Sequence, residues 1–362
     1  MSGRKLRLGV IGAGHLGTIH TRLVRSIDDV DLVGVSDPFP PARRRIAAEF
    51  QVETFEDHRP LLGRIDAAIV AAPTRDHYWI GMELAEAGVH LLVEKPLTAS
   101  VAEADALIRA ARTRNLVLQV GHVERFNPAF TAASRMSSPR YVEAVRASGY
   151  TGRSVDVGVV LDLMIHDIDL VLSLVGSELV EVDAVGTAVL GPHEDMAHAH
   201  LRFANGCLAS LNASRTSYQS QRTMQIFGEQ GYAGIDFATG SVKLIRPSDP
   251  VRRRQIDVLQ LNAEERRQLP QRLFNDLLLV EDVQPEKRNA ILDEQHDFVI
   301  SIRSGQQPQV TGQHGRDALA AAERILQRIH EPQASDRRAP LTQGPHWDLA
   351  PQGVAQRIRK AG

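Results

Sequence analysis

The chain has 362 residues, of which 43% are hydrophobic and 24% charged, and its formal net charge is −2. This length allows two domains, each with a core, and the near-neutral charge gives no reason to expect nucleic acid or an anionic membrane as a partner. Cys207 is the only cysteine, so no internal disulfide can form, and we expect a reducing, cytoplasmic location. We expect neither a membrane span nor a signal peptide, because no apolar run approaches ~20 residues.

Short apolar segments alternate with amphipathic ones over the first third of the chain. Apolar strands of this kind suit a parallel sheet buried on both faces. The expected strands are residues 6–11, 31–36, 66–72, 89–94 and 116–121, and the helices between them include 41–50 and 77–87. The alternation predicts an α/β fold with an N-terminal, doubly wound Rossmann domain over residues 1–122.

The pattern changes after about residue 140, where strand-like runs are joined by short turns that contain glycine. This spacing is typical of an antiparallel meander. The expected strands are 196–203, 207–214, 222–228, 232–237 and 241–246, and the expected helices are 161–175, 290–304 and 315–330. We predict an α+β substrate and oligomerisation domain with a large antiparallel sheet over residues 123–330, in which 311–330 packs back as a helix, and a tail at 331–362. Too few helices remain to cover such a sheet, so we expect a partner subunit on it, in a homodimer or homotetramer.

A glycine-rich loop directly follows the first strand and opens a helix. Gly12, Gly14 and Gly17 match the pattern G-x-G-x-x-G. Glycines at these places let the backbone approach a pyrophosphate, whose charge is stabilised at the helix N-terminus. The loop therefore predicts a dinucleotide site, which also includes His15 and Leu16.

Asp37 ends the second strand, 20 residues after Gly17. A carboxylate there accepts hydrogen bonds from the adenosine ribose hydroxyls and repels a 2′-phosphate. The expected cofactor is therefore NAD. The run Arg43, Arg44 and Arg45 leaves an alternative open, because these side chains are either a solvated helix face or a site for the phosphate of NADP.

The almost wholly apolar segment VVLDLMIHDIDLVLSLVG, residues 159–176, is interrupted by polar residues. Asp162, His166, Asp169 and Ser173 follow one another at spacings of four, three and four. Such spacings place side chains on one face of a helix. The stripe is either part of a functional site or a buried hydrogen-bond network.

The end of the fifth strand carries Glu94, Lys95 and Pro96, at the edge of the sheet where open α/β folds bind ligands. Together with the glycine loop and the stretch APTRDHYWIGMELAEAGVHLLVEKP, this motif resembles the Gfo/Idh/MocA oxidoreductases over roughly residues 5–325. The resemblance implies an NAD(P)-dependent oxidoreductase that acts on CH–OH groups. It also implies further cofactor contacts, from Ala72, Pro73, Thr74, His77, Glu94 and Lys95.

A second motif of the family, an Asp and a His four apart on the first helix of the substrate domain, is matched by Asp162 and His166. The resemblance implies that His166 is the catalytic base and that Asp162 fixes its tautomer. Lys95 would hold the same substrate oxygen and stabilise its developing negative charge.

The segments GHVERFNPA and DVGVVLDLMIHDIDL most resemble the bacterial UDP-N-acetylglucosamine 3-dehydrogenases. This resemblance implies oxidation of the C3 hydroxyl of a nucleotide sugar. The expected substrate-binding residues are His122, Arg125, Asn127, Arg153, Asp162 and His166, with Glu124 beside them. A diphosphate needs cations, and Arg125, Arg153 and Arg215 are the candidates, although Arg125 is alternatively an ion-pair residue at a hinge.

Two other functions remain open from the sequence. One is a myo-inositol or free-sugar dehydrogenase, and the other is a non-catalytic, NAD-binding regulator. His198 and His200 would share one face of a strand, but a metal site needs three or four converging ligands, so we expect no metal.

Overall fold

The computed structural model describes residues 3–134, 138–150, 152 and 157–331. They form two compact units, Met1–Asn127 with Arg288–Ala320, and Pro128–Lys287 with Ala321–Gly362. The division differs from the expected domains because residues 288–320 return to the first unit, and the expected tail lies outside the described residues apart from Glu331. None of the described helices has the length and apolar character needed to cross a membrane.

The first unit contains a parallel six-stranded sheet in the order β3-β2-β1-β4-β5-β6. Its strands are β1 Leu6–Ile11, β2 Val30–Ser36, β3 Thr54–Phe55, β4 Ala67–Val70, β5 His90–Glu94 and β6 Leu118–Gly121. Its helices are α1 His15–Val24, α2 Pro40–Phe50, α3 Thr74–Glu86, α4 Val101–Thr113 and α9 Ala290–Ser304, with short 3-10 turns η1 Arg59–Leu61 and η2 Val123–Phe126. The strand order reverses between β1 and β4, which defines the ligand crevice at their carboxyl ends.

Each face of this sheet carries its own apolar core, because side chains alternate along a strand. Val10 points to the face that holds buried residues of α1, α2 and α9, such as Phe298. Ile11 points to the opposite face, with buried residues of α3 and α4 such as Leu84 and Leu107. The sheet is therefore covered on both sides, as the sequence predicts, and α9 is the helix that the predicted domain boundary had placed elsewhere.

The second unit is built on an eight-stranded sheet in the order β14-β13-β12-β11-β7-β10-β9-β8. Its strands are β7 Pro139–Ala147, β8 Leu179–Thr187, β9 Met196–Phe203, β10 Leu208–Ser214, β11 Gln221–Gly228, β12 Gly231–Asp236, β13 Ser241–Pro247 and β14 Leu278–Val283. Its helices are α5 Pro128–Ala133, η3 Val160–Met164, α6 Ile165–Val175, α7 Asp249–Arg252, α8 Ala263–Arg272 and η4 Leu273–Leu277. The helix α10 Gly312–His330 begins in the first unit and ends in the second.

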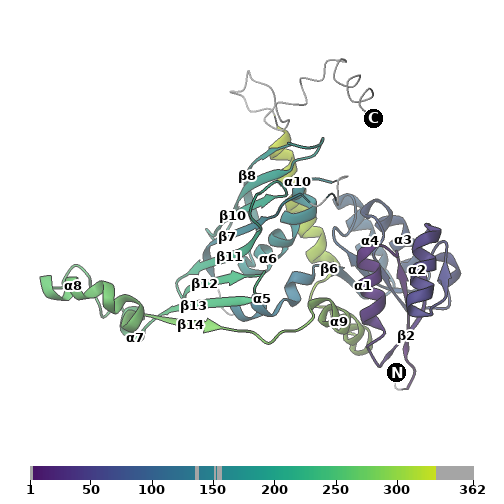
Figure 1. Cartoon of the computed structure of the whole chain (residues 1–362), viewed down its shortest axis with the longest axis horizontal. Coiled ribbons are helices and arrows are strands. Elements are labelled where there is room, and N and C mark those ends of the chain that lie inside the picture. Colours follow the sequence, from purple (N-terminus) through teal and green to yellow (C-terminus); the bar gives the residue numbers. More distant parts are fainter. Residues whose placement is uncertain (1–2, 135–137, 151, 153–156, 332–362) are drawn as a thin grey trace, which may run out of the picture. The chain divides into compact units, whose positions relative to one another are not determined.

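The sheet is antiparallel, as predicted, except where β10 pairs with β7 in parallel. Strands β7, β8 and β14 and helix α8 were not expected from the sequence. Figure 1 shows α7 and α8 beyond the ends of the edge strand β14 and its neighbour β13, and neither helix has a buried residue. Helices without a buried apolar face give weak sequence signals, which explains why α8 was missed.

Candidate active site

The glycine loop after β1 has the close backbone contacts that its sequence predicts. Gly12 has a φ of +105°, and a Cβ atom there would collide with the carbonyl oxygen of Ala71. A Cβ atom on Gly17 would collide with the carbonyl oxygen of Gly12. Gly14 is different, because nothing lies within 4 Å of its Cβ position and no side chain caps α1, which begins at the next residue. The loop thus leaves backbone and space where a pyrophosphate fits.

Asp37 lies directly beside this loop. Its Oδ2 accepts a hydrogen bond from the N–H of Ala13 at 2.7 Å, and its Oδ1 accepts from the N–H of Phe39 at 2.8 Å. Arg43 and Arg45 donate to the backbone carbonyls of Asp37 and Ala13, each at 2.6 Å. Arg43 and Arg45 therefore stabilise the backbone of the glycine loop and of Asp37. The sequence analysis had considered only a solvated helix face or a phosphate site for these arginines.

The connection from β4 to α3 reaches the other side of the crevice. His77 is buried, with Nδ1 2.9 Å from the carbonyl oxygen of Pro96 and Nε2 2.8 Å from that of Ala72. Both ring nitrogens are thus committed to backbone, and His77 joins the ends of β4 and β5. Cofactor contacts by His77, Ala72, Pro73 and Thr74 stay a prediction.

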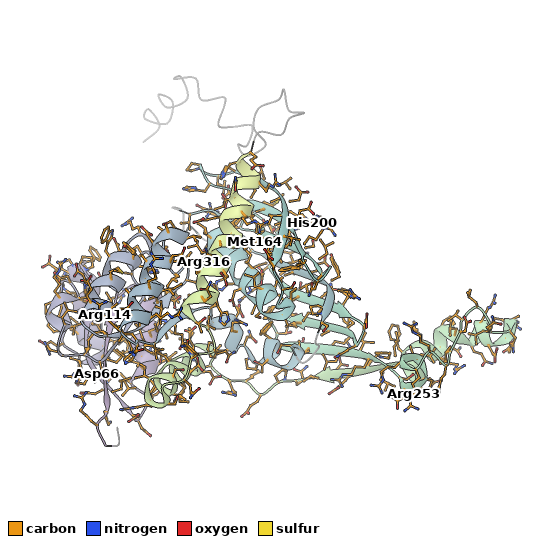
Figure 2. The ribbon with its side chains drawn as sticks, turned by 180° about the vertical axis from the view of Figure 1, so that it is seen from behind. Asp66, Arg114, Met164, His200, Arg253 and Arg316 are labelled. Atoms are coloured by element: carbon orange, nitrogen blue, oxygen red, sulfur yellow. The ribbon has the colours of Figure 1, made fainter. Side chains whose placement is uncertain are left out.

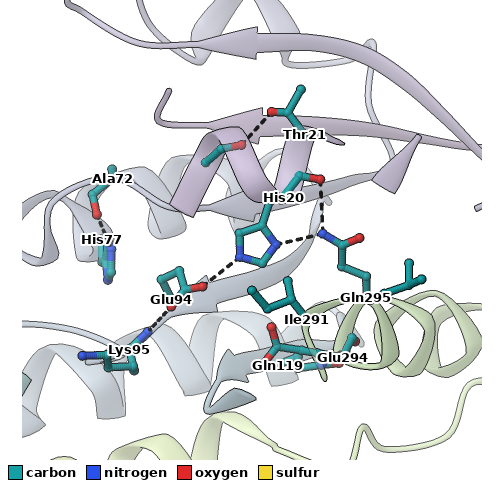
Figure 3. Close-up of polar contacts among 12 residues, drawn as sticks. His20, Thr21, Ala72, His77, Glu94, Lys95, Gln119, Ile291, Glu294 and Gln295 are labelled. Atoms are coloured by element: carbon teal, nitrogen blue, oxygen red, sulfur yellow. Dashed lines mark hydrogen bonds and ion pairs between the residues drawn. The ribbon is translucent and has the colours of Figure 1, made fainter. Parts of the chain in front are cut away.

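Glu94 and Lys95 lie at the carboxyl end of β5, as predicted. The Glu94 carboxylate is buried, with Oε1 2.8 Å from Nε2 of His20, and its Oε2 accepts the N–H of Lys95 at 3.2 Å (Figure 3). Burial opposes the ionisation of Glu94, but the hydrogen bond from His20 and the charge of Lys95 outweigh it and lower the pKa of this carboxyl. The partner His20 was not singled out from the sequence, because only the fold brings it to β5.

His122 follows β6 and is almost fully buried. Burial, together with the positive charges of Lys95 and Arg125, lowers its pKa to about 3, so the ring is neutral at physiological pH. Neither ring nitrogen has a hydrogen-bond partner among the residues that the structure describes. A buried neutral imidazole of this kind can accept from or donate to a ligand hydroxyl.

The residues around His122 are tied to one another. Asn127 donates to Oε2 of Glu124 at 3.0 Å, and the carbonyl oxygen of Arg125 accepts from Gln309 at 3.0 Å. These bonds fix the turn η2, which places the predicted sugar-binding residues next to the end of β6.

In the second unit, Asp162 lies in the π-helical turn η3 and His166 in the first turn of α6. Both side chains are half-buried. The prediction assumed a regular α-helix, whereas the π turn adds a residue to the local repeat. The four polar residues also differ in their surroundings. Asp169 is buried, and the Ser173 hydroxyl donates to the carbonyl oxygen of Leu170 at 2.7 Å.

A buried ion pair beside His166 was missed by the sequence analysis. Asp167 accepts from Nη2 of Arg146 on β7 at 2.8 Å and from its Nε at 3.1 Å. The pair anchors the helix of His166 to the sheet. The sequence does not reveal this ion pair, because Arg146 and Asp167 meet only once β7 has paired with β10 and β11 in the sheet.

One of the predicted cations for a diphosphate already pairs with a carboxylate of the protein. Arg215 forms a buried ion pair with Asp195 at 2.6 Å and donates to the carbonyl oxygen of Val157 at 2.8 Å, so we correct its expected role to a structural one. Arg153 lies outside the described residues. Arg125 remains a candidate.

His198 and His200 share one face of β9, as expected, with their Nε2 atoms 3.1 Å apart; Figure 2 labels His200 on the sheet. Within the described parts of the chain, the only group of three possible metal ligands is His20, Glu94 and Glu294, in the other unit. The two strand histidines therefore have no third ligand among the described residues.

The Rossmann sheet, the glycine loop and Asp37 define an NAD-binding oxidoreductase. Residues 6–122 match the model of the Gfo/Idh/MocA oxidoreductase family, NAD-binding Rossmann fold, and residues 128–233 match the Gfo/Idh/MocA C-terminal domain. The chain belongs to the Gfo/Idh/MocA family, which confirms the resemblance of the E-K-P segment, and NAD is its cofactor.

Individual relatives span nearly the whole chain. The sequence is 36% identical over 326 residues to the UDP-N-acetylglucosamine 3-dehydrogenase of Acidithiobacillus ferrooxidans, which covers 88% of this chain and 95% of that protein. It is 27% identical over 342 residues to the myo-inositol 2-dehydrogenase of Thermotoga maritima, covering 87% and 93%. A solved structure of the Acidithiobacillus ferrooxidans enzyme superposes with a TM-score of 0.79 at 35% identity, covering 90% of this chain and 98% of that one.

Proposed function

We propose that the protein oxidises the C3 hydroxyl of UDP-N-acetylglucosamine, or of a related nucleotide sugar, with NAD as the acceptor. The observation that carries this proposal is the 36% identity to a UDP-N-acetylglucosamine 3-dehydrogenase over 95% of that enzyme's length. The lower identity of 27% to a myo-inositol 2-dehydrogenase makes a cyclitol or free-sugar dehydrogenase the second candidate.

The cofactor is held, in this proposal, by the glycine loop and Asp37. The open space at Gly14 and the uncapped start of α1 suit the pyrophosphate, and the Asp37 carboxylate suits the ribose hydroxyls of NAD. When bound, NAD supplies the hydride acceptor for the reaction.

Oxidation of a secondary alcohol removes a hydride from carbon and a proton from oxygen, so the protein must supply a base. We assign that role to His166, which takes the hydroxyl proton. Asp162 orients the imidazole, and Lys95 donates to the same oxygen and stabilises its negative charge. The support for this assignment is the match to both family motifs, with Lys95 at the carboxyl end of a Rossmann strand.

His122 fits a role in sugar binding. Its ring is neutral and buried, and both nitrogens lack partners among the described residues, so ligand hydroxyls would satisfy them. Arg125 and Arg153 are the cations that we propose for the diphosphate, and Arg125→Ala should raise KM for the nucleotide sugar roughly 10-fold or more with little change in kcat.

A substrate panel tests the proposal. NADH formation is measured with UDP-N-acetylglucosamine, free N-acetylglucosamine, glucose and myo-inositol, and C3 oxidation is checked by mass spectrometry and NMR of the product. Highest kcat/KM for the nucleotide sugar is the expected result. Preference for myo-inositol or a free sugar would replace the first candidate by the second, and binding of NAD without turnover of any of them would leave only the oxidoreductase class.

We also propose that the protein is a cytoplasmic homodimer or homotetramer that associates through the eight-stranded sheet, without nucleic acid. One face of that sheet exposes apolar side chains, among them Val185 on β8 and Phe227 on β11. The ring of Phe227 packs against the half-buried ring of Tyr141. Light scattering tests the assembly, and Phe227→Glu should shift it toward the monomer.

A further inference from the structure

A buried polar cluster connects α1, β5, β6 and α9 behind Lys95. Its members are His20, Glu94, Gln119, Glu294 and Gln295, which Figure 3 labels. Each of them is at most 8% exposed. All five lie in the first unit. Burial of so many polar groups is costly unless hydrogen bonds compensate for it, so their arrangement should follow from the bonds that they make.

Gln295 fixes the proton on His20. Its amide nitrogen lies 2.9 Å from Nδ1 of His20 and 3.3 Å from the carbonyl oxygen of the same residue. A carbonyl oxygen only accepts, so the group that faces it must be the NH2 of Gln295 rather than its oxygen. That NH2 also donates to Nδ1, which leaves the ring proton on Nε2, directed at Glu94.

Glu94 is therefore held on both oxygens. Oε1 accepts from Nε2 of His20 at 2.8 Å, and Oε2 accepts from the N–H of Lys95 at 3.2 Å. The carboxylate also lies against Gly121 on β6, where a Cβ atom would come within 3.0 Å of Oε2. Any movement of Glu94 thus moves the peptide of Lys95.

Glu294 is fully buried, and one of its carboxyl oxygens lies within 4.8 Å of a ring nitrogen of His20 and of a carboxyl oxygen of Glu94. Among the described residues, no group forms a hydrogen bond with either carboxyl oxygen of Glu294. Burial raises its pKa well above the ordinary value, and the nearby charges of Glu94 and Asp297 raise it further. A neutral carboxylic acid at this place puts no second negative charge beside the Glu94 carboxylate, so the bonds of Glu94 to His20 and Lys95 are not disturbed. A metal ion fits less well, because both nitrogens of His20 already serve other partners.

We propose that Gln295, His20 and Glu294 are positioning residues that hold Lys95 in place through Glu94. They act on Lys95 only through their contacts with Glu94, and they do not contact the substrate. The charged and titratable groups around Glu294 are His20 on α1, Glu94 at the end of β5, and Asp297 on α9. The charge of Lys95 acts on Glu94. The inference rests on the proposed function in one respect, which is that Lys95 takes part in the reaction.

Four variants test the proposal through kinetics with NAD and UDP-N-acetylglucosamine. Gln295→Leu and Glu294→Leu should each lower kcat about tenfold, because the lysine is misplaced, with KM for NAD changed less than about twofold. Glu294→Gln is neutral and keeps a donor, so it should retain nearly full kcat. Gln307→Leu is the matched control, since Gln307 is exposed in the loop after α9.

A substrate-free measurement separates this proposal from the proposed function. The chain has only five lysines, at 5, 95, 243, 287 and 360, so carbon-13 labelling at lysine Cε gives few signals, and Lys95→Arg identifies that of Lys95. Its resonance should shift in both leucine variants and stay in place in Glu294→Gln and Gln307→Leu. If the wild type oxidises no sugar, the proposed function fails while this resonance still tests the positioning role.

Two results would overturn the proposal. One is an unchanged Lys95 resonance in Gln295→Leu, and the other is a Glu294→Gln variant as impaired as Glu294→Leu, which would mean that a charged carboxylate is required. If the leucine variants do not fold, Gly121→Ala takes their place, because its Cβ presses on the Glu94 carboxylate from β6. That variant should shift the Lys95 resonance, and no shift would refute the connection between Glu94 and Lys95.

Discussion

The ion pair between Arg146 and Asp167 should be a main support of the helix that carries His166. Two hydrogen bonds of 2.8 and 3.1 Å join the side chains, which are only 7% and 4% exposed. Arg146→Met leaves the carboxylate of Asp167 buried without its partner, and breaking such a pair costs about 3–5 kcal/mol. For a unit of this size, 1 kcal/mol shifts Tm by about 2–4 °C, so we expect Tm to fall by roughly 6–20 °C.

Thermal unfolding by calorimetry and circular dichroism, with NAD present, measures this effect. Replacing both partners, as in Arg146→Met with Asp167→Leu, should restore at least half of the lost Tm, since no charge is left buried. Arg202→Met is the control, because the pair of Arg202 with Glu181 is exposed and should contribute less than about 1 kcal/mol. The reasoning fails if Arg146→Met changes Tm no more than this control does, or if the double variant is as unstable as the single one.

Three further predictions concern the cofactor, the reaction and the pH dependence of stability. The wild type should have a higher kcat/KM with NAD than with NADP. Asp37→Ala should reduce the ratio of the two kcat/KM values, because it removes the repulsion between the carboxylate and the 2′-phosphate of NADP. A higher kcat/KM of the wild type with NADP would refute this prediction. Lys95→Ala and His166→Ala should each lower kcat on the order of 10²-fold or more, and Asp162→Asn should lower kcat less. The affinity for NAD, measured by calorimetry, should stay nearly constant in all three variants. Near-normal turnover by His166→Ala would exclude His166 as the base. Glu294 has a raised pKa in the folded protein, so the folded state retains its proton above the ordinary value of 4.5 and the free energy of unfolding falls as pH rises. Glu294 alone can change the free energy of unfolding by at most about 1.4 kcal/mol per pH unit. Glu294→Gln should therefore make the free energy of unfolding less dependent on pH. An equal pH dependence in the wild type and the variant would show that Glu294 ionises normally.

Local patterns identified the parts of the molecule whose physics is local. The glycines at 12, 14 and 17 were predictable because the turn from strand to helix leaves no room for a Cβ atom at Gly12 and Gly17, and a pyrophosphate needs open space at Gly14. The helix Ala290–Ser304 was predicted with its observed bounds, because Asn289 caps its start and Gly305 ends it. The strands between residues 196 and 247 were found within one residue at each end, since alternation and glycine turns mark them.

The sequence alone was less informative wherever an expected role depended on a distant partner. Arg215 looked like a cation for a diphosphate, but the fold brings Asp195 to 2.6 Å from it, and a buried arginine bonded to a carboxylate is structural. The sequence also did not indicate that both ring nitrogens of His77 lie within hydrogen-bond distance of the backbone carbonyls of Ala72 and Pro96. No spacing along the chain indicates such contacts.

The sequence by itself determined the class of fold, the dinucleotide loop and the E-K-P and Asp–His motifs, because each depends on residues that are close in the chain. Only the tertiary structure decided that α9 belongs with the Rossmann sheet and that Gln295 meets His20, which is 275 residues away. It also decided that Arg146 pairs with Asp167 across β7 and α6. The physical reason is that the free energy of a buried polar group depends on the partners that surround it, and those partners are chosen by sheet order and helix packing.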